Sequence, residues 1–423
     1  MIFALILVPV LGVFGGVHRY LWCRLVRDTT APGSRVRRTG TVAAFALPVI
    51  ALAALLAGRL GAPFALQQVL AWPGYLWLAL VLYLVLALLV GEVVRGVWLR
   101  AVRERGAGAR TAPAVAPVTA PASEPSPSSA PSPATLLPPD TPATQPLPAP
   151  PRRLFVARAV AAGASLAAVA TVGYGAATTL RGPRVKRVTV PLAKLPRAAH
   201  GFRIAVVSDI HLSPVLGRAH TRRIVDTINR TSPDLVAIVG DLVDGSVPDL
   251  GPAAEPLREL QSRQGAYFVT GNHEYYSGAA QWVDYVRELG VHPLENARTE
   301  LPGFDLAGIN DLAGESEHAG PDYRRALGGR DTTRAVVLLA HQPVTIHDTV
   351  RHGVDLQLSG HTHGGQMWPV TYLAAATNPT VAGLARYGDT QLYVTRGAGA
   401  WGPPVRVGAP PDVTIVELAS MRA

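Results

Sequence analysis

Cysteine and charge of either sign are scarce in this chain of 423 residues. Its one cysteine, Cys23, excludes an intrachain disulfide, a cysteine-based zinc cluster and a CxxC redox pair. Charged residues make up 16% of the sequence and hydrophobic residues 48%, whereas roughly 25% charged residues is ordinary for a soluble domain. This imbalance indicates a membrane protein.

Lysine is absent from the first part of the chain, where arginine carries the positive charge. Residues 1–181 hold 16 Arg and 5 acidic residues, a net charge of +11, and residues 182–423 have a net charge of −1. A basic protein invites a nucleic-acid interpretation. Here the part that can form a core is nearly neutral, so we expect the arginines to border membrane segments and expect no nucleic-acid binding.

Long apolar runs are present, and four of them precede residue 181. Each is close to the roughly 20 residues that cross a bilayer as a helix. They run approximately over residues 2–22, 42–60, 69–90 and 159–180. The first run lacks the basic start of a signal peptide, and further runs follow it closely. We therefore predict about four transmembrane helices, with three spans in residues 1–105 and a fourth in residues 152–181.

Ala, Pro, Ser and Thr dominate residues 106–151, a composition that cannot form a packed core and predicts a disordered linker. Directly after it, Arg152 and Arg153 precede Leu154, Phe155 and an apolar helix. This order resembles a twin-arginine export signal. The pair is internal and lacks the usual polar residue before it, so an ordinary basic flank is the alternative.

The distribution of arginine predicts the orientation in the membrane, because cytoplasmic loops carry an excess of basic residues. Six Arg, from Arg19 to Arg38, lie at the end of the first predicted span and in the loop after it. Only Arg59 lies at the turn from the second span to the third, and five Arg follow the third. This pattern places residues 182–423 outside the cytoplasm. The basic residues after the fourth span oppose this orientation. They are Arg181, Arg184, Lys186 and Arg187.

From Arg203 onward, short β-branched runs alternate with segments of helix length. Such runs are typical of buried strands in an α/β domain, which we predict over residues 182–423. Five motifs follow these runs. They are Asp209-x-His211, Gly240-Asp241-x-x-Asp244, Gly271-Asn272-His273-Glu274, His341, and Gly360-His361-x-His363. Ligands of open α/β sheets gather at the carboxyl ends of strands, so the five loops are expected to converge on one site.

The donor types at these loops are carboxylate, imidazole and amide, without thiolate. They suit Mn²⁺, Zn²⁺ or Fe rather than a closed structural zinc site. Seven donors are too many for one tetrahedral ion and suit two ions about 3.5–4 Å apart that share a carboxylate. Residues two apart on an extended segment project to the same side, so Asp209 and His211 can reach one cluster.

These five blocks, in this order over residues 202–366, resemble the calcineurin-like metallophosphoesterases. The resemblance implies a four-layered α/β/β/α sandwich with two divalent metal ions. The GNHEYY and GHTHGGQ forms look like a bacterial branch of membrane-attached or twin-arginine-exported phosphoesterases, some of which act on lipid-linked or envelope phosphates. The apolar spans and the linker lie outside the resemblance.

The same resemblance implies a role for each motif residue. Asp209, His211 and His363 would hold one ion, Asn272, His341 and His361 the other, and Asp241 would bridge them. His273 would contact the phosphate and assist the leaving oxygen, and Asp244 would orient its ring. The nucleophile would be a hydroxide that bridges the metals.

We therefore predict a membrane-anchored phosphoesterase acting on a phosphodiester or on a lipid-linked or envelope phosphate. The alternatives are a cytoplasm-facing nucleotide phosphodiesterase and a metal-dependent sensor that binds a phosphorylated ligand without turnover. Glu274 is expected to support its loop or cap the next helix. Tyr275, Tyr276 and Trp368 border the site and either bind an acyl or sugar group or pack. His220 and the other histidines outside motifs are interpreted as structural or solvated.

Overall fold

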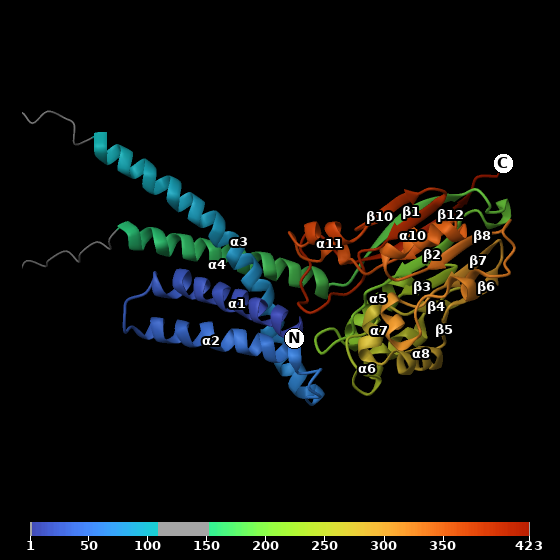
Figure 1. Ribbon diagram of the computed structural model, residues 1–423, viewed down its shortest axis with the longest axis horizontal. Helices are drawn as coiled ribbons and strands as arrows, with labels where there is room; N and C mark the ends of the chain where they lie inside the picture. Colours follow the sequence, from blue (N-terminus) through green and yellow to red (C-terminus); the bar gives the residue numbers. More distant parts are fainter. Residues whose placement is uncertain (1, 109–151, 423) are drawn as a thin grey trace, which may run out of the picture. The chain divides into compact units, whose positions relative to one another are not determined.

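The computed structural model describes Ile2–Gly108 and Arg152–Arg422. By its contacts the chain divides into two compact units, residues 1–38 with 85–165, and residues 39–84 with 166–423. Figure 1 shows the long helices and the C-terminal α/β domain. The predicted linker lies outside the described residues from residue 109 on, whereas residues 106–108 still belong to a helix.

In the part of the chain that the structure describes, four long helices precede the α/β domain. They are α1 (Ile2–Trp22), α2 (Arg35–Leu56), α3 (Phe64–Gly108) and α4 (Arg152–Leu180). Among the described residues, three helical segments are long and apolar enough to cross a membrane: Arg35–Leu56, Phe64–Trp98 and Leu154–Leu180. They correspond to three of the four predicted spans. The predicted first span forms helix α1 but is not among these three, so a fourth span stays a prediction.

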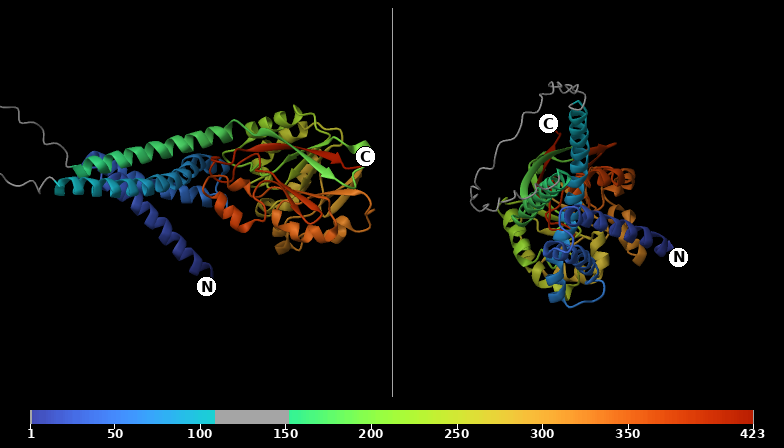
Figure 2. Two further views of the ribbon diagram at one scale, coloured as in Figure 1. Left: turned by 90° about the horizontal axis from the view of Figure 1, so that it is seen from above. Right: turned by 90° about the vertical axis from the view of Figure 1, so that its left-hand side faces the viewer.

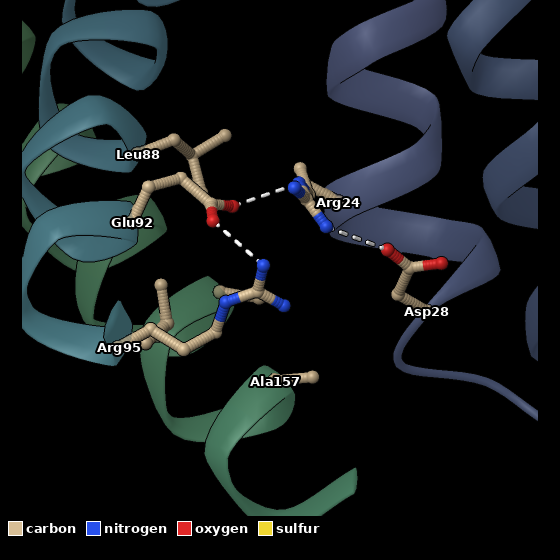
Figure 3. Close-up of a pocket in the computed structure, with 8 residues that line it drawn as sticks. Arg24, Asp28, Leu88, Glu92, Arg95 and Ala157 are labelled. Atoms are coloured by element: carbon tan, nitrogen blue, oxygen red, sulfur yellow. Dashed lines mark hydrogen bonds and ion pairs between the residues drawn. The ribbon is translucent and has the colours of Figure 1, made fainter. Parts of the chain in front are cut away.

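Charged side chains meet within the first unit, as Figure 3 shows. Arg24 Nε lies 2.8 Å from Glu92 Oε1, and Arg95 Nη2 lies 2.8 Å from Glu92 Oε2. Arg24 Nη1 also lies 3.1 Å from Asp28 Oδ2. Charges close to an apolar medium need partners. Glu92 therefore forms ion pairs with two of the arginines in the first part of the chain, Arg24 and Arg95.

The C-terminal domain contains two six-stranded sheets. The first has, in spatial order, β1 (Arg184–Leu192), β12 (Asp412–Ser420), β2 (Phe202–Val207), β3 (Leu235–Val239), β4 (Ala266–Val269) and β5 (Val291–Pro293). The second has β10 (Gly383–Tyr387), β11 (Thr390–Val394), β9 (Leu356–Ser359), β8 (Ala335–Leu339), β7 (Phe304–Gly308) and β6 (Ala297–Leu301). Strands β2 to β5 are parallel, as are β7, β8, β9 and β11.

Alternation along the strands separates the layers, because successive side chains point to opposite faces of a sheet. In β2, Ile204 and Val206 belong to the core between the two sheets, whereas Ala205 and Val207 face helices α5 (Arg218–Asn229), α6 (Val247–Ala254) and α8 (Ala279–Glu288). Helix α9 (Tyr323–Leu327) packs on the outer face of the second sheet. Each fully buried Val, Leu or Ile contributes about 1.5–3 kcal/mol to folding. The mixed α/β fold agrees with the prediction.

Candidate active site

The nine predicted site residues lie at the carboxyl ends of parallel strands from both sheets. Asp209 and His211 follow β2, Asp241 and Asp244 follow β3, and Asn272 and His273 open helix α7 (Asn272–Ser277) after β4. His341 follows β8, and His361 and His363 follow β9. Since the two sheets pack face to face, their strand ends bring the five loops together.

Asp209, His211 and His363 form the first group of candidate metal ligands, with donor atoms within 4.8 Å of one another. His363 Nε2 lies 3.3 Å from Asp209 Oδ1 and 2.9 Å from His211 Nε2. All three residues are buried. Two imidazole nitrogens that face each other at this distance share a proton or a cation between them.

Asp241, His341 and His361 form the second group, again with donor atoms within 4.8 Å. His341 Nε2 lies 3.1 Å from Asp241 Oδ2. His361 Nδ1 lies 3.1 Å from Asn272 Oδ1, which brings the amide of Asn272 to this group. The predicted second set of four donors, Asp241 included, is therefore assembled.

Asp241 stands between the two groups. Its Oδ2 lies 3.1 Å from His341 Nε2 on one side and 3.7 Å from His211 Nε2 on the other. A carboxylate in this position suits the shared ligand of a two-ion site. Its other oxygen, Oδ1, accepts a hydrogen bond of 2.9 Å from the backbone N–H of His273.

Two further observations, both on His341, are what a divalent cation bound by these donors would require. His341 Nε2 is buried and makes no hydrogen bond, although Asp241 Oδ2 lies 3.1 Å away, and a buried polar atom without a hydrogen bond is costly. His341 Nδ1 is 2.8 Å from the carbonyl oxygen of Val239, an acceptor to which it donates. In the neutral ring that bond leaves the Nε2 lone pair free for a metal.

Burial and charge shift the pKa values of the site in opposite directions. Burial raises the pKa of Asp209 and of Asp241, but the neighbouring histidines, His363 and His341 respectively, outweigh it and hold both carboxyls well below their usual range. Burial lowers the pKa of His211, yet Asp244 and Asp241 raise it to about 9. Both carboxylates are therefore ionised at neutral pH and available as ligands.

Two further histidines of the site, His361 and His363, stay neutral at neutral pH. Burial, together with the positive charge of His341, lowers the pKa of His361 to about 4. Burial lowers the pKa of His363 to about 4 as well, although Asp209 opposes the shift. A neutral imidazole is the form that binds metal, so these two rings need lose no proton on metal binding.

Asp244 contacts two histidines. Its Oδ1 lies 2.8 Å from His211 Nδ1 and 2.7 Å from His273 Nδ1, so both rings donate to one carboxylate oxygen. Burial raises the pKa of Asp244, but His211 and His273 together lower it to about 2. The resemblance implied only the contact with His273. The structure adds that Asp244 also orients the candidate ligand His211.

The loops hold these side chains in an unusual backbone conformation. Asp209, His211, Asp241, His361 and His363 all have positive φ, between 48° and 70°. Such left-handed residues cost roughly 1–3 kcal/mol each and gather at functional sites. Gly360 has a separate steric role, because a Cβ there would overlap the side chain of Ser208 and Asp209 Oδ2.

Two further residues support the site. Ser208 Oγ donates to Asp209 Oδ2 at 2.6 Å. Buried Glu274 accepts from the N–H groups of Asp241, Leu242 and Gly271 at 3.0, 2.8 and 2.6 Å, so it ties two loops together, in line with the supporting role expected for it.

Arg406 was not singled out in the sequence. It is buried, and its guanidinium donates to the carbonyl of His363 at 2.7 Å and lies 3.1 Å from His363 Nδ1. No Asp, Glu, Lys or Arg lies between Arg396 and Arg406, but an isolated arginine is too weak a signal to identify it.

The three aromatic residues that the sequence places at the border of the site divide into two kinds. Tyr275 is half-buried, and its hydroxyl lies 3.3 Å from Thr270 Oγ1 and from the carbonyl oxygen of Ala319, so it packs on its own loops. Tyr276 and Trp368 are exposed. The Tyr276 ring stands 5.5 Å from the His273 ring, between centroids. These two remain available to a ligand.

His220, on α5, gives a prediction about stability. It is buried, neither ring nitrogen has a hydrogen-bond partner, and burial, with the charge of Arg223, lowers its pKa to about 3. The unfolded chain binds this proton near pH 6.5 and the folded chain does not, so stability is lost as the pH falls from 6.5 toward 3.

We therefore expect the free energy of unfolding of His220→Leu to exceed that of the unaltered protein by an amount that grows as the pH falls. In that window the difference should increase by up to about 1.4 kcal/mol per pH unit. Thermal unfolding of the full-length chain in detergent between pH 4 and pH 7 measures the difference. Melting curves that shift in parallel for both proteins would contradict the assignment.

Comparison with known proteins identifies the family of the C-terminal part of the chain. The family model for calcineurin-like phosphoesterases matches residues 202–365. A transmembrane protein with metallophosphoesterase domain from Danio rerio is 40% identical over 259 residues, which cover 58% of this chain and 59% of that protein. A metallophosphoesterase of Aquifex aeolicus is 35% identical over 242 residues, covering 56% of this chain and 91% of that protein. A metallophosphoesterase of Helicobacter pylori is 35% identical over 256 residues, which cover 59% of this chain and 68% of that protein.

The family match and the clustered Asp and His side chains place a calcineurin-like phosphoesterase domain in the C-terminal part of the chain. The chain belongs to the calcineurin-like metallophosphoesterase family. It spans less than two thirds of the length of the Danio rerio relative. Its substrate is therefore a matter for proposal.

Proposed function

We propose that this protein hydrolyses a phosphate ester at the site built by the five loops, with Asp209, His211 and His363 holding one divalent ion and Asn272, His341 and His361 a second. The position of Asp241 Oδ2 between His341 and His211 carries the proposal. Mn²⁺, Zn²⁺ and Fe suit these donors. When bound, two such ions supply Lewis acidity toward the phosphate and a hydroxide nucleophile at neutral pH.

His273 is proposed as the residue that protonates the leaving oxygen. Its Nδ1 donates to Asp244, and its Nε2 lies 4.0 Å from Asp241 Oδ2, so Nε2 points toward the metal groups. The side chain is 16% exposed, which allows access to a substrate. A pure phospho-ligand sensor would have no use for such an acid, and this favours turnover.

Turnover of bis-p-nitrophenyl phosphate by the full-length protein in detergent tests the proposal. We expect activity with Mn²⁺, its loss after chelation with EDTA, its return on adding Mn²⁺, and about two metal ions per chain by elemental analysis. Activity that survives complete removal of metal, or binding of the phosphodiester without hydrolysis in the metal-loaded protein, would reject the proposal.

We also propose that the catalytic domain, for which residues 182–423 are the proposed boundaries, lies outside the cytoplasm. Besides the arginine distribution, one contact supports this orientation. Phe64, just after the turn that contains only Arg59, packs against the core of the catalytic domain. The turn between α2 and α3 and the catalytic domain are then on one side of the membrane, the side poor in arginine.

Replacing both Arg152 and Arg153 by Lys tests how the domain is exported. Lysine keeps the charge of the flank but removes the planar guanidinium pair, and the two side chains are not interchangeable at a recognition site. We expect a reporter fused after Ala423 to stay in the cytoplasm in this variant and to be exported in the Arg158→Lys control. Export in the double variant would reject the twin-arginine route. A cytoplasmic reporter on the unaltered protein would reject the orientation itself.

A further inference from the structure

A group of exposed apolar side chains lies beside the candidate metal site. Trp368, Tyr372, Leu373 and Trp401 are 50%, 68%, 69% and 58% exposed, and we call these four residues the apolar rim. Tyr372 and Leu373 belong to α11 (Thr371–Thr377), a helix without buried residues. Exposed apolar groups of this kind mark sites of interaction with proteins, ligands or membranes.

Contacts connect the rim to the site step by step. The ring of Trp401 stands 5.7 Å from that of His273, between centroids. Trp401 is held by Gln366, whose side chain accepts from Trp401 N and donates to Trp401 O, both at 2.9 Å. Gln366 precedes Trp368 by two residues, and α11 follows. The rim therefore begins at the proposed acid and extends outward from it.

Charge is absent from the segments that carry the rim. No Asp, Glu, Lys or Arg occurs between His363 and Arg386, or between Arg396 and Arg406. A helix that faces water normally carries charged residues on its outer face, as α8 does with Asp284, Arg287 and Glu288. Two tryptophans and a tyrosine beside an uncharged helix are the composition found where proteins meet the membrane interface.

The other end of the rim is bonded to membrane-spanning helices of the same compact unit. Tyr83 Oη, in α3, donates to the carbonyl oxygen of Trp368 at 2.9 Å. The backbone N–H of Arg406 donates to the carbonyl oxygen of Gly175, in α4, at 3.1 Å. Gly175 has no room for a side chain, because a Cβ would lie 2.6 Å from Val405 Cγ1. Figures 1 and 2 show α11 at the end of the domain that α4 enters.

Tyr83 and Gly175 both lie within the apolar segments that are long enough to cross the membrane, Phe64–Trp98 and Leu154–Leu180. The domain therefore contacts both segments, through the backbone of Trp368 and of Arg406. From this placement we infer that the apolar rim is inserted into the bilayer and that the metal site receives, from that leaflet, a phosphate ester carried by a lipid. The second part rests on the proposed phosphoesterase activity, and the first part does not.

Insertion is tested with a fluorophore at single cysteines in the full-length chain. Cys23→Ser removes the one native cysteine, after which Leu373→Cys or Met421→Cys is labelled with an environment-sensitive dye. Met421 is a matched control, because it is 65% exposed and lies next to the C-terminus, at the end of the domain away from α11 in Figure 1.

In phosphatidylcholine nanodiscs we expect blue-shifted emission at position 373 and quenching by phosphatidylcholine with nitroxide on its acyl chain. At position 421 we expect emission as in water and no quenching. Equal emission and equal quenching at the two positions would overturn the insertion, whether or not the protein is an active phosphoesterase.

The substrate class is tested with two esters that release the same p-nitrophenol, the water-soluble bis-p-nitrophenyl phosphate and phosphatidyl-p-nitrophenol in the nanodisc. A charge in the bilayer is costly, so Leu373→Asp should lower the ratio of lipid to soluble turnover about tenfold or more. Met421→Asp should leave the ratio unchanged. An unchanged ratio in Leu373→Asp would overturn the lipid substrate, whereas failure of the unaltered protein to hydrolyse either ester would instead reject the proposed function.

Discussion

Asp241→Ala is expected to empty the candidate metal site and to abolish turnover. Asp241 Oδ2 lies between the two groups of ligands, and Oδ1 accepts from the N–H of His273, so one truncation removes a donor from both groups. Elemental analysis should find less than half of the metal that the unaltered protein holds, and turnover of the chromogenic diester should fall by about 10³-fold or more, the scale of losing a metal's electrostatic stabilisation.

A second buried aspartate separates loss of metal from loss of folding. Asp305, on β7, is buried and pairs with Arg298 at 3.1 Å and with Arg334 at 2.8 Å, without being one of the nine site residues. Removing one partner of such a buried pair is strongly destabilising, so Asp305→Ala should lower the melting temperature yet keep its metal. If Asp241→Ala retains both metals while Asp305→Ala loses them, the bridging role of Asp241 is wrong.

His273→Ala is expected to leave the metals bound and to lower turnover of a diester with a poor leaving group by about 10²-fold or more, the usual effect of removing a general acid. The ring lies outside both groups of metal ligands proposed above and is held by its Nδ1 bond of 2.7 Å to Asp244. Elemental analysis and kinetics on the same preparation measure the two effects separately.

The leaving group provides the control for this variant. A p-nitrophenolate leaves without a proton, whereas an alkoxide needs one, so the loss of rate should be much smaller for a p-nitrophenyl ester than for an alkyl ester. Equal losses for the two esters would show that His273 positions the phosphate and does not protonate the leaving oxygen. Loss of metal in His273→Ala would contradict the division of roles altogether.

The buried parallel strands and the order of the site motifs could be predicted from the sequence. The runs Ile204–Val207 and Leu235–Val239 are uniformly apolar because β2 and β3 are covered on both faces. This pattern can be recognised from neighbouring residues alone. Strands with exposed or charged positions escaped the prediction. β1 alternates exposed and buried residues, and β6 carries Arg298 and Glu300, so neither has the apolar run that identifies a strand.

The sequence also determined which side chains are candidates for the chemistry, because donor type and motif order are properties of the chain itself. Only the tertiary structure decided how they share partners. Asp244 accepts from both His211 and His273, and Glu274 joins the loops after β3 and β4. Arg406 donates to the carbonyl oxygen of His363, which lies far from it in the sequence. Such contacts depend on the packing of two sheets, and no local pattern specifies them. The bond from Tyr83 to Trp368 likewise connects α3 to the C-terminal domain through residues far apart in the sequence, a contact that sequence spacing cannot predict.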